Sequence, residues 1–208
     1  KGEVKAISIP TVAAWTDTAV NGGVVQSNKA FFKQLRVTTA TVPNSSIVTD
    51  AMVFGLNSHG TTYNKVDWDK DLLFAFTLAR DTSNAAAVSF IQLKQATVLG
   101  ELAELGIELR IANLALYGNA YGTSLGTEVN LNTTLTNQRS ALLGIFLNAS
   151  GVEWFFNNVS VGTQLTTAGK FHTGMGATQA DLIISHDNGG TATQCDLFVG
   201  DIWIIQEV

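Results

Sequence analysis

Residues 152–163 read VEWFFNNVSVGT, and this stretch is the clearest indication of the fold class in the sequence. Two apolar runs flank the pair Asn157-Asn158. Asparagine tolerates the left-handed backbone conformation, which a two-residue hairpin turn requires at both of its central positions. The stretch therefore predicts an antiparallel β-hairpin with Asn157 and Asn158 at its turn.

The alternation of apolar and polar residues that marks a strand recurs along the rest of the chain. These segments are rich in Val, Ile, Phe, Leu and Thr, and Gly, Asn or Asp usually separates them. The predicted strands are 31–39, 51–56, 72–80, 87–94, 106–112, 128–131, 141–148, 152–157, 181–186 and 196–206. The residues 187–190, DNGG, predict a turn before the last strand.

Only residues 95–105 have helical spacing, and Gly100 interrupts them, so a turn of helix and a loop are both compatible with this segment. No linker-like composition divides the chain, so we expect one domain over residues 1–208. With many short strands and almost no helix, the apolar faces must be hidden by stacking or closing the sheets. The sequence predicts an all-β sandwich or barrel.

The composition excludes several classes of protein. Charged residues make up 14% of the chain, against about 25% in an average globular protein. The net charge of −5 argues against a nucleic-acid-binding protein, and no apolar run has the roughly 20 residues of a membrane span. One cysteine, Cys195, cannot form an internal disulfide, and we expect it to be a buried thiol.

The charge is unevenly distributed along the chain. Residues 1–139 contain 11 basic and 11 acidic residues, whereas residues 140–208 contain only Lys170 and six acidic residues. A sparsely charged surface with a few acids explains this, and a cation-binding end is the alternative. So low a charge also suggests that part of the exterior is buried against other copies or partners.

Several motifs together resemble a known superfamily. Residues 106–113 read GIELRIAN and residues 116–118 read LYG; a Thr- and Asn-rich stretch and the hairpin ending in VGT follow. This order resembles the concanavalin A-like lectin/glucanase superfamily, in which a hairpin F-x-V-[ND]-G-x-x-V-G recurs and a strand similar to residues 196–204 closes the domain. Asn158 stands where that family usually has Gly.

The resemblance implies a two-sheet antiparallel β-sandwich, the concanavalin A-like jelly roll. The superfamily includes lectins, glycan-cleaving enzymes, laminin-G-like adhesive modules and parts of viral particles, so the resemblance does not select one activity.

No catalytic constellation stands out in the sequence. The retaining glucanases of this superfamily carry E-x-D-x-x-E on one strand, which places two carboxylates about 5 Å apart, and the motif is absent here. Glu101, Glu104 and Glu108 are the nearest alternative, and we expect Glu108 to form a surface pair with Arg110. Residues 122–126 match G-x-S-x-G, but no helix follows, as a nucleophile elbow would require. We therefore predict no catalytic residues and no enzymatic activity.

Three acids, Asp67, Asp69 and Asp71, have the D-x-D-x-D spacing that opens many calcium sites. The later positions of an EF-hand loop are occupied by Leu72 and Leu78, so that motif is incomplete. The alternative is a solvated strand edge before the buried 72–78 run. We expect no cofactor, and calcium at these three residues is the alternative.

Aromatic residues next to amides offer a second kind of site. Sugars stack their apolar faces on aromatic rings, and Asn or Asp side chains bind the hydroxyls. Tyr117 and Tyr121 lie on one side of an extended chain with Asn119 between them, and Trp68 stands beside two acids. These four residues are the glycan-binding candidates, with ordinary core or surface aromatics as the alternative. Trp154 and Trp203 alternate with apolar residues and are expected in the core.

These observations favour binding or assembly over catalysis. The sequence predicts a structural or adhesive module of a virus particle or an extracellular assembly, with glycans as a ligand and homo-oligomers or other subunits as partners. It predicts neither nucleic-acid binding nor a membrane span, and places the protein in a virion or outside the cell. A soluble lectin and a polysaccharide hydrolase or lyase are the alternatives.

Overall fold

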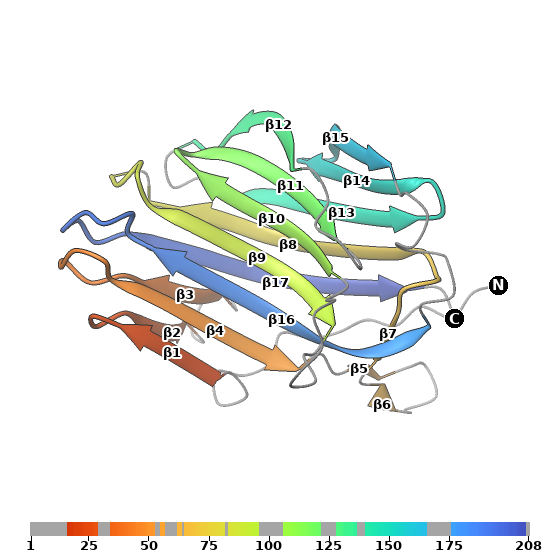
Figure 1. Ribbon diagram of the computed structural model, residues 1–208, viewed down its shortest axis with the longest axis horizontal. Helices are drawn as coiled ribbons and strands as arrows, with labels where there is room; N and C mark the ends of the chain where they lie inside the picture. The colour runs from red at the N-terminus through yellow and green to blue at the C-terminus, as the bar shows by residue number, and fades with distance from the viewer. Residues whose placement is uncertain are drawn as a thin grey trace.

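The computed structural model describes residues 16–28, 34–52, 55–56, 62–63, 65–81, 83–95, 106–121, 128–136, 140–165 and 176–206. In these segments the chain is all-β and contains no helix (Figure 1). Two antiparallel sheets stack face to face and form a sandwich. The predicted all-β sandwich is therefore confirmed. The described part contains no helix that is long and apolar enough to cross a membrane.

One layer is an eight-stranded sheet, seen at the front in Figure 1. A short strand, β7 (Lys65–Asp67), pairs with the start of β16 outside the main order. The main order is β1 (Thr16–Val20), β4 (Ser46–Met52), β16 (Ala177–Asp187), β9 (Val88–Gln95), β10 (Gly106–Ala112), β11 (Ala115–Tyr121) and β12 (Val129–Thr134).

The other layer is a seven-stranded sheet. Its order is β15 (Val159–Leu165), β14 (Gly151–Phe156), β13 (Ala141–Asn148), β8 (Leu72–Arg80), β17 (Asp196–Gln206), β3 (Gln34–Thr38) and β2 (Val24–Asn28). Two further strands, β5 (Gly55–Leu56) and β6 (Thr62–Tyr63), form a separate two-stranded sheet.

The core lies between the two sheets, where alternate side chains of every long strand point inward. On β8 the inward residues are Leu72, Phe74, Phe76 and Leu78, and on β10 they are Ile107, Leu109 and Ile111. The intervening residues face outward and form the two outer faces of the sandwich. A binding site formed by side chains of the sheets must therefore lie on one of these outer faces.

The hairpin prediction is confirmed. Asn157 and Asn158 have φ angles of 49° and 65°, and they join β14 to β15. The Oδ1 of Asn157 also accepts a hydrogen bond from the backbone N–H of Leu142 at 2.9 Å, which ties the turn to β13. The turn at 187–190 is confirmed too, with Gly189 and Gly190 at positive φ.

The strand predictions for 72–80, 106–112, 141–148 and 196–206 match β8, β10, β13 and β17 residue for residue. The single strand predicted over 51–56 is wrong, because β4 already starts at Ser46 and residues 55–56 pair in another sheet. Strands β1, β2 and β7 were not predicted, since short polar segments such as TDTAV lack a clear alternation. The segment 96–105, for which a helical turn or a loop was expected, lies outside the described residues.

Candidate functional site

The outer face of the eight-stranded sheet brings together polar and aromatic side chains from four neighbouring strands. We call this surface the β10–β11 face, and it consists of Phe90, Gln92, Glu108, Arg110, Tyr117, Asn119, Glu128 and Asn130. Strand register sets two rows across it. One row runs Phe90, Arg110, Tyr117 and Asn130, and the other runs Gln92, Glu108 and Asn119.

The first row holds a fixed aromatic ring. The guanidinium carbon of Arg110 lies over the ring of Tyr117, 4.3 Å from its centroid. Glu128, just before β12, accepts two hydrogen bonds from Arg110, one from Nε at 2.6 Å and one from Nη2 at 2.5 Å. These bonds raise the pKa of the Arg110 guanidinium. The two hydrogen bonds to Glu128 fix the Arg110 guanidinium, and the guanidinium in turn restricts the orientation of the Tyr117 ring.

The second row holds a carboxyl group with unusual electrostatics. Glu108 is 7% exposed, and Nε2 of Gln92 donates a hydrogen bond to its Oε2. Burial raises the pKa of Glu108, the hydrogen bond from Gln92 lowers it, and the charge of Glu128 raises it; the net direction is upward. The expected Glu108–Arg110 surface pair is therefore wrong, because Arg110 pairs with Glu128 instead.

Asn119 lies opposite Glu108 in the β10–β11 register. Its Oδ1 is buried and accepts no hydrogen bond from the described residues. A buried acceptor without a donor is costly, and here it lies on a face that carries further donors and acceptors. This position therefore has one unused acceptor.

Tyr121 belongs to the same strand and lies opposite Gly106. Since side chains alternate along a strand, Tyr117 and Asn119 share one face of β11. Four residues at about 3.3 Å each separate the two tyrosine positions by about 13 Å. The backbone of β11 places all three residues on one extended strand, whereas the side chain of Tyr121 is outside the described part.

The glycan-binding prediction for Trp68 needs correction. Its indole is 0% exposed, and its Nε1 donates a hydrogen bond to Oγ1 of Thr178 at 2.7 Å. Its backbone N–H also donates to the carbonyl of Gly176 at 3.1 Å. Trp68 thus packs the turn after β7 into the core, and a sugar cannot stack on its ring.

The calcium prediction for Asp67, Asp69 and Asp71 also needs correction. Asp67 ends β7 and its Oδ1 accepts a hydrogen bond from the backbone of Asp69 at 3.1 Å, while Asp69 Oδ2 accepts one from the backbone of Gly176 at 2.7 Å. Asp67 and Asp69 thus fix the turn after β7 and its contact with Gly176, just before β16. Across the described ranges, no three His, Cys, Asp or Glu side chains are grouped so that they could hold a metal ion.

A buried polar cluster lies between the sheets, well separated from solvent. Ser89 Oγ and His186 Nδ1 are 2.8 Å apart, and His186 Nε2 lies 3.2 Å from the carbonyl oxygen of Cys195. Burial and the positive charge of Arg80 lower the pKa of His186 to about 4. Burial raises the pKa of the Cys195 thiol, which is buried as expected. The cluster has a serine, a histidine and a thiol, but all are inaccessible to a substrate.

The core prediction for Trp203 is wrong, whereas the one for Trp154 is confirmed. Strand β17 has a bulge between Gly200 and Trp203, with Asp201 at a φ angle of 44°. An extra residue reverses which side chains face inward. Ile202 and Ile204 consequently enter the core, and Trp203 is 39% exposed on the outer face of the seven-stranded sheet.

The fold is shared with solved structures of known proteins. A structure of botulinum neurotoxin type C, a toxin that depends on interaction with two ganglioside molecules to get into cells, superimposes with a TM-score of 0.59 and 12% identity; it matches 100% of this chain and 48% of the toxin chain. The β-glucanase of Bacillus licheniformis matches with a TM-score of 0.57 and 12% identity over 100% of this chain and 98% of the enzyme. The chain therefore has the concanavalin A-like jelly-roll fold.

An endo-acting O-glycanase of the human gut microbiota has the same jelly roll, with a TM-score of 0.59 and 9% identity over 95% of this chain and 94% of the enzyme. No protein-family model and no curated protein sequence matches this chain. At these identities the neighbours establish the jelly roll and no activity. This jelly roll spans about half of the toxin chain that it matches.

Proposed function

We propose that this jelly roll is a non-catalytic glycan-binding module of an adhesive or structural assembly, in a virus particle or outside the cell. The observation that carries the proposal is the ring of Tyr117, which Arg110 and Glu128 hold in place on the β10–β11 face. A ring that is already fixed loses little conformational entropy when a sugar stacks on it.

The polar groups around the ring suit a ligand rich in hydroxyls. Asn119 has an acceptor without a donor among the described residues, Gln92 and Glu108 lie in the same row, and Asn130 lies beside Tyr117 across the β11–β12 pair. The distribution of this chemistry over four strands fits an extended saccharide better than a single small polar molecule. The glycan-related proteins among the structural neighbours support the same ligand class.

The test is binding of the full chain to a glycan array, followed by titration of the best ligand with the Tyr117→Ala variant. We expect the variant to bind at least about fivefold more weakly, because loss of a stacking contact with an aromatic ring costs about 1–3 kcal/mol. Phe198→Ala provides the matched control. On the opposite sheet Phe198 lies under Arg36, which pairs with Asp196, so the control removes a similar arrangement elsewhere.

Equal binding by wild type and Tyr117→Ala, or equal losses in Tyr117→Ala and Phe198→Ala, would rule out the β10–β11 face as the glycan site. The assembly part of the proposal has its own measurement. Electron microscopy and mass determination of the native particle should reveal a regular lattice or ring. A monomer that binds glycans would instead identify the soluble lectin.

A polysaccharide hydrolase or lyase is the second candidate, and Glu108 is the observation that favours it. A carboxyl group with a raised pKa on a binding face has the properties of a general acid. A retaining hydrolase also needs a second carboxylate about 5 Å away; on this face the other described carboxylate, Glu128, is engaged by Arg110. Cleavage of a bound polysaccharide that Glu108→Gln abolishes would establish the enzyme and reject the non-catalytic proposal.

A further inference from the structure

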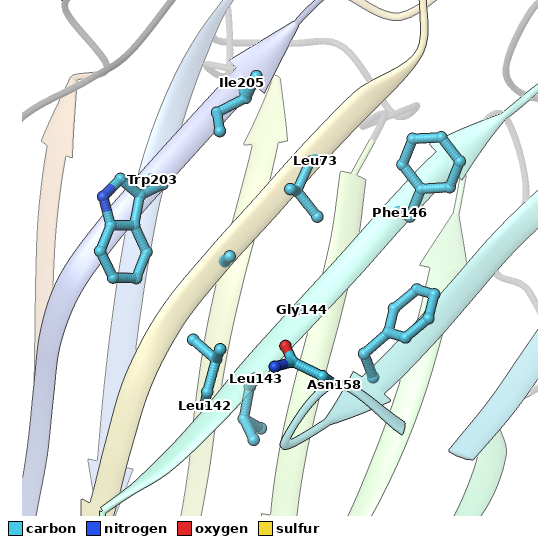
Figure 2. A pocket seen from close by; sticks show the side chains of 10 residues that line it. Leu73, Leu142, Leu143, Gly144, Phe146, Asn158, Trp203 and Ile205 are labelled. Atoms are coloured by element: carbon cyan, nitrogen blue, oxygen red, sulfur yellow. The ribbon is translucent and has the colours of Figure 1, made fainter. Parts of the chain in front are cut away.

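The outer face of the seven-stranded sheet carries an apolar groove that the glycan proposal does not use (Figure 2). Strand register places Trp203, Ala75, Gly144 and Phe155 in one row across β17, β8, β13 and β14. The row has a large aromatic residue at each end and two small residues between them. With neighbouring strands about 4.8 Å apart, this row forms a trough about 14 Å long that crosses the strands.

Larger apolar side chains form the sides of the trough. Leu73, Phe146 and Ile205 stand along one side, and Leu142 stands on the other, as Figure 2 shows. The groove has a volume of about 620 Å³, within the range of small-molecule sites. No charged side chain lines it, and its lining includes one polar side chain, Asn158.

Each end of the trough has a carboxylate nearby. Glu153 precedes Phe155 by two residues on the same face of β14 and lies opposite Phe146. Asp201 is exposed at the β17 bulge, two residues before Trp203. Among the residues that the structure describes, neither carboxylate has an ion-pair partner.

We propose that this groove binds an alkylammonium compound, a linear hydrocarbon chain that ends in a positively charged amine. The chain fills the trough over Ala75 and Gly144, where apolar contact is available and no polar group competes. The ammonium lies at an end, against an aromatic ring and near a carboxylate. Trp is the aromatic side chain that attracts a cation best, and recognition of quaternary ammonium groups by aromatic residues is a common use of this contact.

The charges decide between this ligand and the other occupants of an apolar groove. A second copy of the chain docked face to face would bring Glu153 and Asp201 against the same acids, because the one base among the described outward residues of this sheet, Arg36, already pairs with Asp196. A fatty acid or another anionic amphiphile would meet the same repulsion. An amphiphile with a positive head group is complementary to both the apolar lining and the acidic ends.

The experiment is calorimetric titration of the full chain with octyltrimethylammonium, below the concentration at which it forms micelles. Sodium octyl sulfate tests the sign of the charge, and tetramethylammonium tests the need for the chain. We expect saturable one-to-one binding of octyltrimethylammonium, at least tenfold weaker binding of octyl sulfate and no measurable binding of tetramethylammonium.

Two variants locate the binding in the groove. Gly144→Leu fills the floor of the trough, and we expect it to weaken octyltrimethylammonium binding at least tenfold. A Cβ at this glycine would lie 3.5 Å from Phe155 Cβ, an ordinary contact, so the backbone accepts a side chain there. Glu153→Gln combined with Asp201→Asn retains shape and removes both charges. Asn tolerates the positive φ of residue 201, and we expect about tenfold weaker binding of the cation only.

Several results would overturn the proposal: no saturable binding of octyltrimethylammonium, octyl sulfate bound as tightly as the cation, or unchanged affinity in both variants. The groove and the β10–β11 face belong to opposite sheets. Tyr117→Ala should therefore leave octyltrimethylammonium binding unchanged, so failure of the glycan proposal and failure of this one are separate outcomes.

Discussion

At Gly118 the space that a side chain would occupy is filled by Trp154. A Cβ at this position would lie 2.3 Å from Cε2, 2.6 Å from Cδ2 and 2.7 Å from Nε1 of the indole. Gly118 lies next to Tyr117 in β11 but does not open space beside it on the outer face. It instead faces inward and lets the buried indole of Trp154, on the seven-stranded sheet, reach β10 and β11, where its Nε1 donates to the carbonyl of Glu108 at 3.4 Å.

We expect Gly118→Ala to lower the free energy of unfolding by about 1–3 kcal/mol, because the added methyl overpacks a rigid ring. Urea denaturation followed by fluorescence measures the change. Gly144→Ala is the matched control, since its Cβ would meet its nearest neighbour at 3.5 Å, and its stability should stay within about 1 kcal/mol of wild type. Similar losses in both variants would show that backbone entropy or strand propensity, and not the Trp154 contact, sets the effect.

Only some of the residues of the candidate site are predictable from the sequence. The sequence indicates that Tyr117, Asn119 and Tyr121 alternate along one strand, because period-two spacing is a local property. It does not indicate that Arg110 and Glu128 flank Tyr117, since that depends on the pairing of β10 and β12 with β11. The one available signal was the return of the chain at Asn113 and Leu114, both at positive φ in the structure, which aligns Arg110 with Tyr117.

At the level of elements, the two sheets are joined at one side by a glutamine side chain. Gln164 of β15 accepts a hydrogen bond from the backbone N–H of Ala120 at 2.9 Å and donates one to its carbonyl at 3.2 Å. Among the described residues, β12 pairs with β11 no further along than Gly118, so no described strand of this sheet meets the free backbone edge of Ala120. The amide of Gln164 takes the place of that strand.

Gln164→Leu should therefore destabilise the protein by about 1–3 kcal/mol, because it leaves two backbone groups of the buried Ala120 unpaired. Thermal or chemical unfolding measures this loss, and hydrogen exchange at the Ala120 amide should become faster. Gln179→Leu, the same substitution at an exposed position of β16, is the control and should change stability by less than about 0.5 kcal/mol. An unchanged exchange rate at Ala120 would contradict the assigned role.

Strands and turns are predictable from the sequence where they depend on neighbouring residues, and they are not predictable where they depend on pairing with distant segments. The Asn157-Asn158 turn and the long strands β8, β10, β13 and β17 follow from turn chemistry and alternation. The exposure of Trp203 does not, because the bulge at Asp201 shifts the inward face of β17 by one residue without breaking its apolar pattern. That shift supplies the part of the groove on the seven-stranded sheet that Trp203 and Ile205 line.

At the scale of the whole molecule, the order of the strands in the two sheets is not predictable from the sequence. Strand β16 lies between β4 and β9, and β17 lies between β8 and β3, so the last two strands complete both sheets. This order brings Arg80, Ser89, His186 and Cys195 from separate parts of the chain into one buried cluster. The histidine of that cluster couples the stability of the sandwich to pH.

His186 has a pKa of about 4 in the folded protein, because burial and the charge of Arg80 disfavour its charged form, while Asp196 acts in the opposite direction. In the unfolded chain its pKa is the ordinary 6.5. Below pH 6.5 the unfolded state therefore binds a proton that the folded state does not. The contribution of the neutral His186 to the stability is complete above pH 6.5 and is lost as the pH falls toward 4.

We expect this histidine to lower the free energy of unfolding by about 3 kcal/mol between pH 7 and pH 4, from the difference between the two pKa values. Glu108 acts the other way, since a raised pKa in the folded state favours folding as the pH falls, and Asp196, with a lowered pKa, adds to the loss on acidification. The comparison with His186→Gln isolates the histidine from both. Urea unfolding at intervals of half a pH unit should give a steep decline for wild type and a shallower one for the variant, which keeps a side chain able to bond Ser89. Parallel pH profiles would mean that His186 titrates normally or that the cluster opens before it is protonated.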